Sequence, residues 1–118
     1  MKRITIAIIC VGLFCLQCFA QKKQKVKYEF PPQMSEKVKG QFTELCDKGQ
    51  VLYAINCSSC HNIKVKGKDV IPDFTQEKLI GYELRVSNGQ HEENMPDTKV
   101  TAEELGLITT FLTYKKKN

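Results

Sequence analysis

The sequence predicts an all-α protein, a single domain of three or four short helices joined by long loops. Apolar residues recur at helical spacing in three separate segments, and each segment begins at a Ser or Thr that can cap a helix. No alternating run is long enough for a convincing strand. The chain has 118 residues, 42% of them hydrophobic and 26% charged, which is typical of one globular domain.

The first twenty residues are predicted to be an export signal. Two positive charges near the start precede an almost unbroken apolar run over residues 4–19, which ends at the small residue Ala20. Cleavage after Ala20 is the favoured interpretation. The alternative is an uncleaved membrane anchor, because the run approaches the ~20 residues that span a bilayer. In both cases we expect the domain to be periplasmic or otherwise exported.

Residues 21–34 are predicted to be a tether, because QKKQKVKYEFPPQ combines a charge run with a Pro-Pro pair that cannot enter a helix interior. The domain is expected at residues 35–118. The formal charge of +5 comes from the ends, since residues 28–114 hold nine basic and 13 acidic residues, a net of −4. The basic ends are expected to be solvated, and no nucleic-acid partner is expected, because such proteins spread their bases over a folded face.

Each helix has its own signals. The first is predicted from the candidate N-cap Ser35 to about Cys60, as one helix or two. The second is predicted at residues 76–87, capped by Thr75 and ended by Ser87-Asn88-Gly89. The third begins with the capping box TAEE, and its apolar side carries Leu105, Ile108, Phe111 and Leu112. The intervening NIKVKGKDVIPD lacks a helical period and is predicted to be a loop.

The stretch CSSCH carries the strongest chemical signal. On a helical turn Cys57 and Cys60 face the same way, with His61 beside them. This spacing suits haem, which needs two thiols for its vinyl groups and an imidazole for its iron, and C-x-x-C-H is the attachment signal of c-type haem. A zinc site completed by Cys46 and His91, a redox dithiol and a simple disulfide are the alternatives. Once the leader is removed, an odd number of cysteines remains, which argues against a disulfide framework.

A second iron ligand is predicted at Met95 in HEENMPD, where Pro96 fixes the backbone directly behind it. His91, four residues earlier, is the rival ligand. A small domain with short helices buries little apolar surface, so a bound prosthetic group would also supply the core that the chain lacks.

In this order the motifs resemble a small class I c-type cytochrome. DKGQVLYAINCSSCH resembles the family's first helix and attachment site, and TQEKLIGYELRVSNGQHEENMP resembles the helix and turn before its Met-Pro ligand loop. TAEELGLITTFLTY resembles its last helix, so the likeness covers about residues 44–114. It implies the cytochrome c fold around one covalently bound haem c, held by Cys57 and Cys60, with His61 as proximal and Met95 as distal ligand.

The resemblance also implies that the carbonyl of Pro72 accepts the ring N–H of the histidine ligand. It further implies that Gly49 and Tyr53 lie where the first and last helices touch. Cys46 has no role in the family pattern and is expected to be a small buried hydrophobe, with a disulfide-linked dimer as the alternative.

An iron with both axial positions filled by protein groups leaves no place for substrate, so the implied function is one-electron transfer at positive potential rather than enzyme catalysis. The partners would be a redox donor and acceptor whose identity the sequence does not give. The alternative is a haem enzyme or gas sensor with a labile distal ligand. The predicted loop carries three lysines, Lys64, Lys66 and Lys68. They form either a docking patch for an acidic redox partner or a solvated loop.

Overall fold

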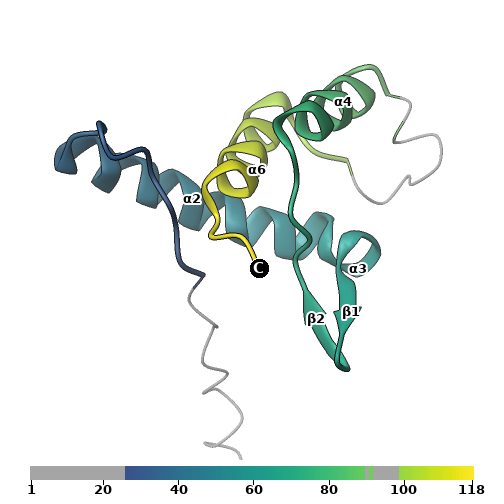
Figure 1. Ribbon diagram of the computed structural model, residues 1–118. Helices are drawn as coiled ribbons and strands as arrows, with labels where there is room; N and C mark the ends of the chain where they lie inside the picture. The colour runs from purple at the N-terminus through teal and green to yellow at the C-terminus, as the bar shows by residue number, and fades with distance from the viewer. Residues whose placement is uncertain (1–25, 90, 92–98) are drawn as a thin grey trace, which may run out of the picture.

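The computed structural model describes residues 26–89, 91 and 99–118 (Figure 1). Within these residues the chain is mostly helical, as predicted. Its elements are α2 (Glu36–Asn56), α3 (Ser58–His61), β1 (Ile63–Val65), β2 (Lys68–Val70), α4 (Gln76–Ser87) and α6 (Ala102–Tyr114). None of the described helices is long and apolar enough to cross a membrane. The predicted export signal lies outside the described residues.

The first helical segment is one long helix followed by a separate turn. The side chain of Ser35 caps α2 by accepting from the backbone N–H of Val38 at 3.4 Å, which confirms the predicted N-cap. The helix then runs without interruption to Asn56. Cys57 has φ −124° and ψ −33°, outside the helical region, so the chain breaks there before α3. The break therefore falls within CSSCH.

Both later helices have the predicted caps. The hydroxyl of Thr75 accepts from the backbone of Lys78 at 3.3 Å. At α6 the capping box is complete, because Glu104 N–H donates to the Thr101 hydroxyl at 3.2 Å and Thr101 N–H donates to the Glu104 carboxylate at 2.8 Å. Local side-chain to backbone bonds thus fix where these helices begin.

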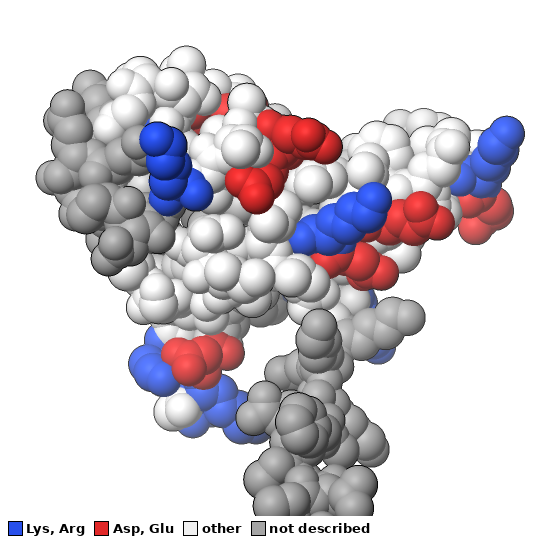
Figure 2. All heavy atoms as spheres, turned by 180° about the vertical axis from the view of Figure 1, so that it is seen from behind, with Lys and Arg blue, Asp and Glu red and all other residues white. Residues whose placement is uncertain are grey.

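The prediction of a loop between α3 and α4 is wrong in part, because the segment contains a β-hairpin. Strands β1 and β2 pair antiparallel, and the turn residues Lys66 and Gly67 both have positive φ, 50° and 77°. A two-residue turn of this kind matches the twist of a hairpin. Across the strands the Lys64 ammonium lies 2.7 Å from the Asp69 carboxylate. The hairpin projects from the helices, and Figure 2 shows basic and acidic side chains side by side on it.

Part of the segment predicted as a tether contacts the helical domain. Tyr28 forms an antiparallel β-bridge with Lys115, and the rings of Phe30 and Tyr114 lie 5.1 Å apart, centroid to centroid. Residues 27–30 therefore pack along the C-terminal end of α6. Their order depends on contacts with a distant part of the chain, which local composition does not reveal.

The C-terminal lysine run is also not simply solvated. Lys115 is only 5% exposed, and its ammonium lies 2.6 Å from the Asp73 carboxylate. The backbone N–H of Asn118 donates to the same carboxylate at 3.1 Å. These bonds hold the segment between β2 and α4 against the end of α6.

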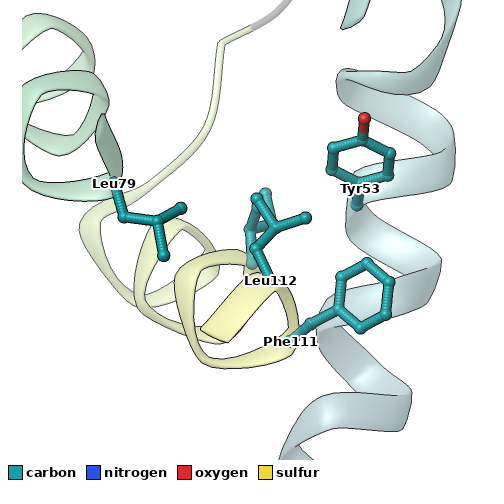
Figure 3. Close-up of a cluster of buried hydrophobic side chains, with 5 residues drawn as sticks. Tyr53, Leu79, Phe111 and Leu112 are labelled. Carbon is teal, nitrogen blue, oxygen red and sulfur yellow. The ribbon is translucent and has the colours of Figure 1, made fainter. Parts of the chain in front are cut away.

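The core lies where α2 meets α6 (Figure 3). A Cβ added to Gly49 would lie 2.7 Å from the carbonyl carbon of Leu107 and 2.8 Å from the Cβ of Phe111, so only glycine permits this approach. One turn along, the rings of Tyr53 and Phe111 lie 5.9 Å apart. The predicted helix contact at Gly49 and Tyr53 is confirmed. The central cluster of buried side chains is Tyr53, Leu79, Ile108, Phe111 and Leu112.

Candidate functional site

An open, largely apolar pocket lies between the end of α2, α3, α4 and α6. The empty space in it is about 600 Å³, a figure that includes open solvent at its mouth. Helix α4 contributes Leu79, Tyr82 and Val86 to its lining, and α6 contributes Leu105, Ile108 and Leu112.

Two of the three chemical residues of CSSCH reach this pocket. Cys57 and His61 both line it and are half-buried. The backbone N–H of His61 donates to the Cys57 carbonyl at 2.9 Å, which holds both residues on one turn. Cys60, on the same turn, is exposed. Cys57, directly before α3, and His61, at the end of α3, thus both lie at one apolar space. The three described cysteines form no disulfide with one another.

Burial sets the protonation of these groups. It raises the pKa of the Cys57 thiol, which keeps the thiol protonated near neutral pH. It also lowers the pKa of His61, and the nearby His91 lowers it further, so the imidazole is neutral at that pH. Neutral imidazole is the form that binds a metal.

Tyr53 connects the core to the site. Its hydroxyl donates to the Asn62 side-chain oxygen at 2.9 Å, directly after His61 in the chain. Burial, with a smaller effect from Cys57, raises the Tyr53 pKa to about 12, so this hydroxyl remains a donor at physiological pH. The end of α2 and the residue after the imidazole are therefore held together.

Two rings face the His61 imidazole. Tyr82 meets it edge-on, with centroids 5.8 Å apart, and its own ring also contacts Phe74. Sequence reasoning did not single out Tyr82, although it lies three residues after Leu79 and so on the same side of α4. Leu84, on the same helix, is instead 64% exposed. The second ring is His91, whose plane is inclined by 17° at a centroid distance of 6.3 Å.

The remaining predicted site residues are not brought to the pocket by anything that the structure describes. Met95 lies outside the described residues, although His91 and Val100, on either side of it in sequence, both line the pocket. Pro72 is described and half-buried. Within the described part of the chain, no hydrogen bond joins its carbonyl to the His61 ring, so its role stays a prediction.

The zinc alternative loses support from the length of α2. Cys46 precedes Cys57 by eleven residues, which is about 16 Å along a helix. Its sulfur lies 3.8 Å from the Thr110 carbonyl, and the residue is fully buried. Burial, with Asp47 nearby, raises the pKa of this thiol to about 11. Cys46 is therefore a small buried hydrophobe, as predicted. Among the described residues, no group of three or more His, Cys, Asp and Glu is placed to hold a metal ion.

In the described residues, the redox-dithiol alternative also lacks the βαβ unit that such a motif requires. Such a motif follows a strand inside a βαβ unit, whereas here a helix of 21 residues precedes Cys57 and a hairpin follows His61.

Comparison of the chain with protein-family models, with curated proteins and with solved structures finds no match.

Proposed function

We propose that this protein is a mono-haem c-type cytochrome that carries single electrons between exported redox proteins. The observation that supports this most is the open apolar pocket that Cys57 and His61, held together on one turn, both line. A thiol, a neutral nitrogen ligand and apolar walls are the groups that a covalently attached haem requires. The residues present therefore fit this cofactor.

In this proposal Cys57 and Cys60 hold haem c by thioether bonds and His61 is the proximal iron ligand. Met95 is the distal ligand and Pro72 orients the histidine ring, both as the family resemblance implies. The bound group would supply an iron that changes by one electron. The chain's own part is to hold, enclose and orient it.

The apolar lining of the pocket would affect the reduction potential of the proposed haem iron. Leucine, isoleucine and valine side chains from α4 and α6 line the pocket, and apolar surroundings of low dielectric would disfavour the extra positive charge of ferric iron. A thioether ligand acts in the same direction, since it is soft and neutral. Both effects raise the reduction potential above that of an exposed centre.

The contact between α2 and α6 supports a cytochrome c-like fold. In the family resemblance the first and last helices meet at Gly49 and Tyr53, and this meeting point lies next to the pocket because Tyr53 also lines it. The cofactor would complete the core that three packed helices leave open.

Donor and acceptor are proposed to be redox proteins outside the cytoplasm, with membrane association if the N-terminal segment stays uncleaved. No nucleic-acid partner is proposed. The hairpin lysines are a weaker docking candidate than the sequence suggests, because Lys64 is paired with Asp69.

A redox titration of the purified holoprotein tests the carrier function. We expect a reversible one-electron transition at positive potential, and slow or absent carbon monoxide binding to the reduced protein. Rapid carbon monoxide binding would instead favour the alternative function, a haem enzyme or gas sensor whose distal ligand leaves readily.

A further inference from the structure

The two histidines of the chain meet in one pocket. His61 comes from α3 and His91 follows α4, so they approach from different elements. Their ring planes are nearly parallel, inclined by 17°, and their centroids lie 6.3 Å apart. The chain contains two histidines in all, so every imidazole it has lines this space.

This separation matches two imidazoles that share one metal ion. An ion lies about 2 Å from each bound nitrogen, and each nitrogen lies about 1 Å from its own ring centroid, so two opposed rings have centroids roughly 6 Å apart. Offset stacking of aromatic rings covers similar distances. Ring contact without a metal is therefore the competing explanation, and an experiment has to separate the two.

A turn at the end of α4 precedes His91. The N–H groups of Asn88 and Gly89 donate to the Leu84 and Val86 carbonyls, which closes the last turn of the helix. Gly89 has φ 79°, a conformation that glycine adopts without strain. His91 lies two residues beyond this turn, where its side chain lines the pocket.

We infer that His91 binds the iron opposite His61 in the ferric protein. This rests on the proposed function, because it assigns a ligand to the haem iron of that site. Met95 and His91 would then compete for one position. The thioether is the softer ligand and favours ferrous iron, whereas the imidazole is the better ligand for ferric iron. The chain thus carries a distal ligand suited to each oxidation state.

Labelling gives a direct test that needs no variant. Holoprotein is prepared with isotope-labelled histidine nitrogens and oxidised, and the hyperfine couplings to the ferric iron are measured by electron paramagnetic resonance methods. Since the haem nitrogens stay unlabelled, the couplings report how many histidines bind. Two coordinated histidines support the inference. One coordinated histidine, together with the long-wavelength charge-transfer band of an iron–thioether bond, overturns it.

Variants then assign the second ligand. In ferric His91→Ala we expect the count to fall from two to one and the thioether band to appear as Met95 takes the position, with a raised potential. Ferric Met95→Ala should keep two coordinated histidines. Tyr82→Leu removes the other ring that contacts His61 and supplies no nitrogen, so it should also keep two. If Tyr82→Leu changed the count as His91→Ala does, ring packing and not ligation would explain the geometry.

The two proposals fail differently. Holoprotein whose iron binds one histidine and Met95 overturns the role of His91 and leaves the electron carrier intact. Chain that never acquires covalent haem overturns the proposed function itself.

Discussion

Gly49 in α2 lies so close to the backbone of Leu107 in α6 that a side chain has no room between the two helices. The Cβ of Phe111 closes the same space at 2.8 Å from where a Gly49 Cβ would be. Because the nearest atoms belong to a helix backbone, relief requires the helices to separate. The protein therefore depends on the absence of a side chain at this point.

Gly49→Ala is expected to destabilise the protein. Overpacking typically costs about 1–3 kcal/mol, and each kcal/mol shifts the melting temperature of a domain this size by about 4–8 °C. Gly40 provides the matched control, since it lies in the same helix and an added Cβ would meet nothing within 4 Å. Gly40→Ala should raise stability by about 0.5–1 kcal/mol through helix propensity. Equal melting temperatures for the two variants would contradict the tight helix contact.

The pair Asp73 and Lys115 predicts a pH dependence. Burial alone would raise the Asp73 pKa, but the hydrogen bonds from Lys115 and Asn118 lower it below its usual value. A carboxyl whose folded pKa is depressed stabilises the fold above its unfolded pKa of about 3.9, and this stabilisation is lost as the pH falls through the folded pKa. The free energy of unfolding should therefore decline in acid, in a range below about pH 4.

Asp73→Asn tests this pair, because it leaves the Lys115 ammonium buried without its anion. We expect a loss of at least about 1–3 kcal/mol at neutral pH that shrinks in acid, measured by denaturant unfolding across pH. Glu29→Gln is the control. It breaks the contact of Glu29 with Lys116, which is exposed and 3.9 Å long, and should cost less than about 1 kcal/mol. A loss for Asp73→Asn that is independent of pH would count against the ion pair.

The helices could be predicted from the sequence because their signals are local. Ser35, Thr75 and Thr101 all cap the helices that they were predicted to cap. The hairpin could not be predicted in this way, since strands of three residues are too short to show alternation. The β-bridge between Tyr28 and Lys115 could not be predicted either, because the two residues are far apart in the sequence.

In the candidate site, too, local features could be predicted from the sequence and tertiary contacts could not. The spacing of Cys57 and His61 on one turn follows from five consecutive residues, so the sequence predicts their proximity. That both line one pocket, and that Tyr82 and His91 face the same imidazole, depends on how α4 packs on α6. Such tertiary contacts leave no mark in local spacing. Met95 remains a prediction from sequence alone.

Loss of either attachment thiol should lower the yield of holoprotein. Cys57→Ala and Cys60→Ala would each remove one of the two proposed covalent bonds to the cofactor, and with it part of what would stabilise a small core. Cys46→Ala is the control, because Cys46 is buried against Thr110, far along α2 from the site. Haem content per chain after purification measures the effect. A yield that falls equally for all three variants would point to general destabilisation instead of lost attachment.

Met95→Ala should lower the reduction potential by something on the order of 100 mV, since a soft ligand that stabilises ferrous iron is removed. Carbon monoxide should also bind the reduced variant faster than the parent protein, because the remaining candidate ligand His91 is the weaker one for ferrous iron. Potentiometric titration and carbon monoxide mixing measure the two effects. An unchanged potential would exclude Met95 as a ligand of the reduced protein.

The central claim is that Cys57 and Cys60 attach haem covalently. The most direct measurement is the mass of the full chain, produced with a c-type cytochrome maturation system and unfolded before analysis. We predict that the unfolded chain keeps one haem and remains red, and that the Cys57→Ala, Cys60→Ala double variant keeps none. A wild-type chain that loses all its haem on unfolding, or never acquires any, would contradict the account.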